Sequence, residues 1–203
     1  MNKFRSLLLV LSLLAVGLQG CAEMSTMLST VERRSTGSMI DDEGIELRAT
    51  NRVEERFKKT VHVNVTSYNR NVLLTGEVPN QAARAEIEKI AAGAGTVRSV
   101  TNELQVIDAT SLASRASDTT ITGKVKARFV DSAKFSALLV KVVTENSVVY
   151  LMGIVTESEA NEAVEIARTT GGVKKVVKVF EYCKPTDAIC APRAQAKAEE
   201  PKK

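Results

Sequence analysis

Hydrophobic and polar positions follow the same order twice along residues 44–182. Each copy opens with three apolar residues spaced four apart, and the second trio lies 76 positions after the first: Ile45, Ala49 and Val53, then Ile121, Val125 and Phe129. Spacing by four places side chains on one face of a helix. Each copy is therefore predicted to open with an amphipathic helix whose apolar face lies against a core.

Alternating apolar residues predict two half-buried strands next in each copy, over residues 61–65 and 72–78 and again over 140–142 and 149–155. The polar segments SYNRN and TENS separate the strands of each pair and are rich in turn-forming residues, which predicts hairpins. Gly76 and Gly153 interrupt the second strand of each pair, where a glycine permits a bulge or the close approach of a neighbouring backbone.

A second helix follows in each copy, around residues 86–91 and 162–167, and Thr156 and Glu159 have the spacing of a capping box before the latter. A valine-rich segment then predicts a last strand. The predicted fold class is α+β, with two tandem αββαβ domains, each a three-stranded mixed sheet with two helices packed on it. Strand, helix and strand form a crossover that is expected to be right-handed.

The N-terminus predicts an export signal. Lys3 and Arg5 precede an apolar block from Leu7 to Leu18, which is too short to span a bilayer and suits a secretory signal. The residues before Cys21 resemble the lipobox of bacterial lipoproteins, in which that cysteine is acylated. Ala22 is not the aspartate that signals inner-membrane retention, so the resemblance favours the outer membrane, with the chain facing the periplasm.

These boundaries divide the chain into five parts. The predicted parts are a signal peptide over 1–20, a lipid-anchored tether over 21–43, a first domain over 44–108, a second over 117–182, and a disulfide-closed loop with a flexible charged tail over 183–203. The formal net charge of the whole chain is +4, and removing Lys3 and Arg5 with the signal leaves it nearly neutral. The basic pI therefore gives no support to nucleic-acid binding.

Cys183 and Cys190 are the remaining cysteines. In an oxidising periplasm, a disulfide between them is the favoured interpretation. A metal pair is the alternative, but it would need two further ligands, and the single histidine, His62, lies in the other copy.

Two closing segments, G-x-V-x-x-V at 95–100 and G-G-V-x-x-V at 171–176, together with the strand–Gly–Val segments, resemble the BON-domain family. Two copies after a lipobox resemble its dual-domain outer-membrane lipoproteins. That resemblance implies a protein without known catalysis whose second domain binds anionic phospholipid through its first helix. It also implies support of envelope integrity and a role at division sites, with division or other envelope proteins as further partners.

Catalytic, metal and cofactor sites are not expected. His62 alternates with two valines on the outward side of a strand and is predicted to be solvated, and the glutamates of the helix around 162–167 are predicted on its water side. The chain shows no phosphate loop, metal-ligand cluster or nucleophile motif, and no basic stripe interleaved with aromatics. Neither a small-molecule substrate nor nucleic acid is expected as a partner.

The first helices of the two copies differ in charge. Residues 45–57 hold three arginines and three glutamates, whereas 118–130 hold Lys124, Lys126 and Arg128 against Asp118 alone. The outer face of the second helix is small and apolar with basic edges, which is typical of a surface that rests on an anionic bilayer. The predicted phospholipid site consists of Thr120, Gly123, Lys124, Lys126, Ala127, Arg128 and Val130.

One position departs from the family pattern. The resembling lipoproteins carry a tryptophan at the position of Thr120, and this chain has no tryptophan. An interfacial aromatic favours membrane contact, so its absence should weaken lipid affinity. The alternative function is a periplasmic adaptor, in which the same helix docks an envelope protein or packs on the first copy.

Overall fold

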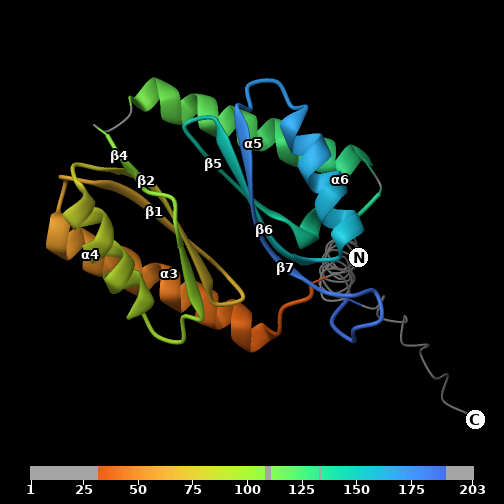
Figure 1. Ribbon diagram of the computed structural model, residues 1–203, viewed down its shortest axis with the longest axis horizontal. Coiled ribbons are helices and arrows are strands. Elements are labelled where there is room, and N and C mark those ends of the chain that lie inside the picture. The colour runs from red at the N-terminus through yellow and green to blue at the C-terminus, as the bar shows by residue number, and fades with distance from the viewer. Residues whose placement is uncertain (1–31, 108–110, 133, 191–203) are drawn as a thin grey trace, which may run out of the picture. The chain divides into compact units, whose positions relative to one another are not determined.

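Helix α3 (Thr36–Phe57) opens the first of two similar domains (Figure 1). The computed structural model describes residues 32–107, 111–132 and 134–190. The predicted signal peptide, Cys21, most of the tether and the charged tail lie outside the described residues.

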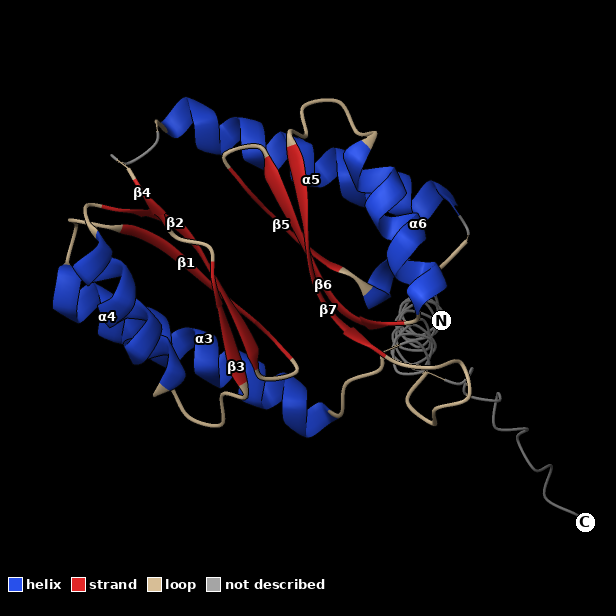
Figure 2. Cartoon of the chain, viewed as in Figure 1, coloured by secondary structure: helices blue, strands red, loops and turns tan. Residues whose placement is uncertain are grey.

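The first domain has a mixed sheet with two helices on one face (Figure 2). Strand β2 lies in the centre, antiparallel to β1 and parallel to β3 and β4. The predicted last strand is therefore split into two short strands. The remaining elements of the domain are β1 (His62–Tyr68), β2 (Asn71–Val78), α4 (Gln81–Ala92), β3 (Ser99–Asn102) and β4 (Gln105–Val106).

The second domain repeats this order with one addition. Its central strand β6 is antiparallel to β5 and parallel to β7, and a short 3₁₀ helix, η1, precedes β5. The elements are α5 (Leu112–Ser132), η1 (Ala137–Leu139), β5 (Lys141–Glu145), β6 (Val148–Val155), α6 (Glu157–Arg168) and β7 (Lys175–Tyr182). The predicted α+β class with two αββαβ domains is confirmed.

The two apolar trios of the opening helices lie in the cores as predicted. Every one of the six side chains is at most 3% exposed. In the first domain they pack with Val72, Leu74 and Val78 of β2 and with Ile87 of α4. Burying each large aliphatic side chain contributes about 1.5–3 kcal/mol, so the four-residue period and the alternating strand together supply most of the core.

Helix α3 begins earlier than the sequence pattern predicts. Ser35 is its N-cap, and the Ser35 hydroxyl accepts a hydrogen bond from the backbone N–H of Ser38 at 3.0 Å. Residues 36–43, which the polar pattern places in the tether, are therefore helical. Ser38 and Asp42 extend the buried face of the helix by about two further turns. Because both residues are polar, hydrophobic periodicity does not reveal this extension.

Gly76 and Gly153 occupy points where two backbones approach closely. A Cβ atom at Gly76 would collide with the carbonyl oxygen of His62, and a Cβ atom at Gly153 would collide with that of Leu139. Gly76 also has a positive φ of 119°, a conformation that side chains disfavour. The predicted role of these glycines in close backbone approach is confirmed.

The central strands are buried on both faces, whereas the alternating pattern predicts half-buried strands. Seven of the eight residues of β2 and of β6 are buried. On the face away from the helices, Tyr68 and Leu73 of the first domain form one cluster with Tyr150, Met152 and Ile154 of the second. Each sheet is thus covered by helices on one face and by the other sheet's residues on the other.

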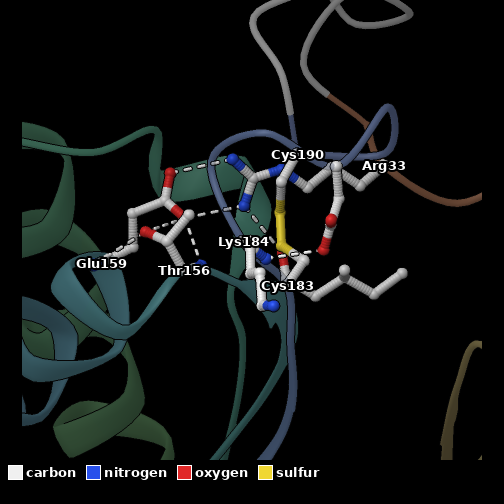
Figure 3. The surroundings of a disulfide bond; sticks show 8 residues. Arg33, Thr156, Glu159, Cys183, Lys184 and Cys190 are labelled. Carbon is white, nitrogen blue, oxygen red and sulfur yellow. Dashed lines mark hydrogen bonds and ion pairs between the residues drawn. A yellow bond between two sulfur atoms is a disulfide. The ribbon is translucent and has the colours of Figure 1, made fainter.

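The chain beyond β7 is linked to this cluster through a disulfide between Cys183 and Cys190, whose Cα atoms lie 6.1 Å apart (Figure 3). Cys190 is 5% exposed and belongs to the cluster between the sheets. Close by, the Arg33 guanidinium binds the Glu159 carboxylate at 2.7 Å and the Ile154 carbonyl at 2.9 Å. Both ends of the described chain are therefore held against the second domain.

Candidate functional site

The outer face of α5 presents all seven residues of the predicted phospholipid site to solvent. Each of them is exposed, and Val130 is 70% exposed. Gly123 has open space where a side chain would lie. The opposite face of the helix buries Ile121, Val125 and Phe129, so the fold orients the predicted surface outward.

Arg128 differs from the other residues of this face because its guanidinium is already engaged. It donates from Nη1 to the carbonyl oxygen of Ile166 and to the hydroxyl of Thr170, both at 2.7 Å. These acceptors lie at the C-terminal end of α6, where helix carbonyls lack partners within the helix. The first role of Arg128 is therefore to join the two helices.

The first domain uses its arginines in the same way. Arg48 and Arg52 of α3 donate to the carbonyl oxygens of Ala94 and Gly93 at 2.8 and 2.7 Å, beyond the end of α4. Arg56 pairs with Glu86 of α4. The basic residues of α3 thus make these contacts within their own domain.

Lys124 and Lys126 are the cations of α5 that keep their charge at the surface. Both side chains are exposed, and neither makes an ion pair with any residue of the described chain. Of the two acidic residues of this helix, Asp131 is exposed, whereas Asp118 is only 5% exposed and accepts hydrogen bonds from the backbone N–H groups of Asn146 and Ser147. The surface of α5 is therefore more basic than its residue count predicts.

A hollow of about 400 Å³ lies along the flank of α5 that carries Lys126 and Val130. Phe129, Ala137, Leu138 and Val140 supply apolar lining, and Leu138 is 53% exposed. Lys126, Lys141 and Arg34 supply positive charge to the same lining. Lys141 is paired with Glu46 and Arg34 with Asp42, which leaves Lys126 as the lining cation with no acid partner among the described residues.

The sequence pattern does not predict the contribution of η1 to this hollow. In the first domain the connection from α3 to β1 is the short polar segment 58–61, whereas the connection from α5 to β5 spans 133–140 and contains η1. The apolar run Ala137–Leu139 is the only available signal, and it resembles the beginning of a strand. The two copies differ in this segment, and a comparison of the repeats reveals the difference.

His62 is half-buried and not solvated as the strand alternation predicts. The exposed fraction of its side chain is 21%, and its Nδ1 lies 2.9 Å from Oε2 of Glu77. Asn64 on the same strand donates to the Glu145 carboxylate of the second domain at 2.7 Å. The outward side of β1 therefore faces the other domain and not water, which is the physical reason for the wrong prediction.

Two carboxylates of the described chain have altered acidity. Burial raises the pKa of Glu145 above its ordinary value, and the nearby charges of Glu77 and Asp118 raise it further, against the opposing effects of Asn64 and His62. Burial alone would also raise the pKa of Glu159, but hydrogen bonds from Arg33 and Thr156 outweigh it and lower that pKa.

No helix among residues 32–107, 111–132 and 134–190 combines the length and the apolar character that crossing a bilayer requires.

The BON domain family model matches residues 41–108 and 117–184. The outer membrane lipoprotein DolP of Haemophilus influenzae is 42% identical over 151 residues, which cover 73% of this chain and 78% of that protein. The 21 kDa hemolysin of Actinobacillus pleuropneumoniae is 34% identical, with 75% and 79% covered. Osmotically-inducible protein Y of Escherichia coli is 32% identical, with 69% and 72% covered. The names of these relatives specify no enzymatic reaction.

Proposed function

Because the chain belongs to the BON-domain family and carries two BON domains in tandem, we propose that it is a non-enzymatic outer-membrane lipoprotein, anchored through Cys21 and facing the periplasm. Its similarity to a protein named as an outer membrane lipoprotein supports this placement. In this proposal α5 of the second domain binds the anionic phospholipid of the membrane surface.

The observation that carries the lipid proposal is the pair of uncommitted lysines on the small, apolar outer face of α5. Lys124 and Lys126 lie at its two edges, and neither has an acid partner in the described chain. An interfacial lysine contributes about 1 kcal/mol of attraction to an anionic leaflet. Val130 and Leu138 add exposed apolar surface beside Lys126, which suits the boundary between headgroups and acyl chains.

A modest affinity is sufficient for this function. An acyl anchor at Cys21 would keep α5 close to the membrane, so the second contact would form at a high effective concentration. The absence of an interfacial tryptophan is then tolerable. Support of envelope integrity and action at division sites, which the family resemblance implies, form the physiological part of the proposal.

Reversing the two lysine charges tests the proposed contact. Lys124→Glu combined with Lys126→Glu should lower binding of the acyl-free chain to anionic liposomes more than tenfold at low salt, because about 2 kcal/mol of attraction is replaced by repulsion. Cosedimentation with vesicles that contain or lack phosphatidylglycerol measures this. Circular dichroism should show an unchanged fold, since both side chains are exposed.

Lys58→Glu combined with Lys59→Glu is the matched control. Both residues are exposed and follow α3, and the pair changes the net charge by the same amount. Arg48 and Arg52 are unsuitable as controls because they bind carbonyl oxygens of their own domain. Equal losses in the two double variants would show a general charge effect and would refute the assignment to α5.

Thr120→Trp tests the same face in the opposite direction. The indole should strengthen liposome binding, because aromatic side chains favour the membrane interface. Since the chain contains no tryptophan, the new residue is also the only source of indole fluorescence. A blue shift of its emission on adding anionic vesicles is expected, and unchanged emission together with unchanged affinity would contradict the proposal.

The alternative is a periplasmic adaptor in which α5 docks an envelope protein. The exposed apolar residues Val130 and Leu138 are compatible with it. Intact binding to liposomes of neutral lipid, or no binding to liposomes of any composition, would favour the adaptor over the lipid proposal.

A further inference from the structure

Three side chains with metal-binding groups meet between the two domains. His62 and Glu77 lie on neighbouring strands of the first domain, and Glu145 comes from the end of β5 in the second. One potential ligand atom from each residue lies within 4.8 Å of the others. Imidazole nitrogen and carboxylate oxygen are ligands that Zn²⁺ accepts in proteins.

Amides from opposite domains orient both carboxylates. Asn146 of the second domain donates from Nδ2 to Oε1 of Glu77 at 2.9 Å. Asn64 of the first domain donates from Nδ2 to Oε2 of Glu145 at 2.7 Å. Such hydrogen bonds from surrounding residues fix the direction of ligating carboxylates in metal sites. They leave oxygen atoms of both groups within reach of His62.

Asn146 is itself held in place by the hairpin turn between β5 and β6. The backbone N–H groups of Asn146 and Ser147 both bind the buried Asp118 carboxylate, at 2.9 and 2.8 Å. With both its oxygens engaged by the turn, Asp118 positions Asn146 and is not counted among the ligands.

Three buried carboxylates lie in the cluster or next to it. Glu77 is 1% exposed, Glu145 4% and Asp118 5%. A buried carboxylate is costly unless it is paired or coordinates a cation. A hollow of about 330 Å³ reaches His62 and Glu145 from outside and is lined also by Arg115, Thr122 and Thr144, so a hydrated ion has a route to the cluster.

The fold does not require polar residues at these three positions. The strand pairings of the two domains match when each residue of the first domain is compared with the residue 77 positions later. Gly76 then corresponds to Gly153. The counterparts of His62, Glu77 and Glu145 are then Leu139, Ile154 and Tyr68, all at most 4% exposed. At the equivalent positions of the other domain, the same fold therefore buries apolar residues. Packing alone does not explain why His62, Glu77 and Glu145 are polar.

We propose that His62, Glu77 and Glu145 form a Zn²⁺ site that bridges the two BON domains. Tetrahedral bonds of about 2.0–2.2 Å would place the ligand atoms about 3.4 Å apart, which needs only a small contraction of the cluster. The hydrogen bond between His62 and Glu77 is exchanged for two bonds to the ion. The fourth position faces the hollow and takes water. One imidazole with two carboxylates supplies too few oxygen ligands for Ca²⁺.

The ion would act as a clamp. Because its ligands come from both domains, it binds the state in which the two sheets are packed together and stabilises that state by mass action. This inference concerns the joint between the domains and is independent of the proposed lipid surface on α5.

Equilibrium dialysis of the chain from residue 22 onward, which retains every described residue, tests the site. The protein should carry no histidine tag and should be stripped with EDTA before Zn²⁺ is added. We expect one equivalent of tightly bound Zn²⁺ per chain. His62→Gln in the first domain and Glu145→Gln in the second should each weaken binding at least about tenfold, since even residues that only orient metal ligands contribute that much.

Glu181→Gln is the matched control because it removes an equal charge from another carboxylate between the domains. Glu181 accepts hydrogen bonds from Asn69 and Asn71 of the first domain and pairs with Arg98. Its substitution should leave Zn²⁺ binding unchanged. Circular dichroism and melting without metal identify any variant that fails to fold.

Three results would overturn the proposal: no stoichiometric binding by the unaltered chain, equal losses in all three variants, or a loss in only one of the two ligand variants. Co²⁺ provides a second readout, since a site with few ligands gives intense visible absorption. That absorption should be present in the unaltered chain and in Glu181→Gln, and absent from His62→Gln.

Discussion

A buried aspartate holds the hairpin of each domain. Asp42 accepts hydrogen bonds from the backbone N–H groups of Asn69 and Arg70, at 2.8 and 2.6 Å. Asp118 does the same for Asn146 and Ser147. All four turn residues have φ between 51° and 65°, a region that non-glycine residues seldom adopt. The aspartates help to hold these turns.

Asp118→Ala should destabilise the second domain by about 2–4 kcal/mol. The substitution leaves two backbone N–H groups without their charged acceptor, and each such loss costs about 1–3 kcal/mol when the groups are buried. Urea denaturation followed by circular dichroism measures the change. Asp131→Ala, at an exposed position of the same helix, is the control and should change the stability by less than about 0.5 kcal/mol.

Residue types alone do not predict the role of these aspartates. An aspartate on an amphipathic helix is expected to face water. For that reason, Asp118 counts as a surface charge in the charge comparison of the two helices. Its burial depends on the hairpin that folds over it, which follows 28 residues later. The same limit applies to His62. The carboxylate that it faces belongs to another strand, and residues that surround it belong to the other domain.

At the scale of the element, α6 begins with the capping box that the sequence predicts. Thr156 accepts from the backbone N–H of Glu159, and Glu159 accepts from that of Thr156 at 2.7 Å. The structure adds Arg33, which binds the same carboxylate from the segment before α3. The predicted water-side position of Glu159 is therefore wrong, because a distant segment covers it.

This cap should make stability depend on pH in the acid range. The folded state lowers the pKa of Glu159 below its ordinary 4.5. The stabilisation is therefore present above pH 4.5 and is lost as the pH falls through the lowered pKa. Glu159→Gln keeps the hydrogen bonds of a capping box but not the charge, and should be about 1 kcal/mol less stable at neutral pH.

The difference in stability should disappear in more acidic solution. Thermal unfolding of both proteins from pH 7 down to pH 3 measures it. Glu162→Gln, which removes the carboxylate of an exposed pair with Lys134, serves as the control. A constant difference between Glu159→Gln and the unaltered chain across this range would show that charge is not the cause.

Helix α5 shows which part of a proposed binding surface a single element can predict. Its seven predicted residues all face solvent, because the helical period that buries Ile121 and Phe129 also exposes the opposite side. Helical periodicity does not reveal that Arg128 binds α6 or that η1 and Arg34 complete a hollow beside Lys126. These features depend on contacts between segments far apart in the sequence.

At the scale of the whole molecule, the proposed function depends on the anchor. Cys21→Ala should abolish labelling of the chain by radioactive palmitate, because the acylated thiol is absent, and should leave a soluble or unprocessed product. Labelling followed by separation of membrane and soluble fractions measures both effects. Continued palmitate labelling of the variant would refute acylation at Cys21.

The sequence by itself determined the two αββαβ units, their cores and the outward face of α5, because local periodicity decides which side of a helix or strand is apolar. Only the tertiary structure decided what covers the second face of each sheet. That face brings Tyr68 and Leu73 against Tyr150 and Met152 and places His62 beside Glu145. Periodicity indicates whether a face of an element is buried or polar. It does not indicate which distant segment packs against that face, because that depends on how complete domains pack together.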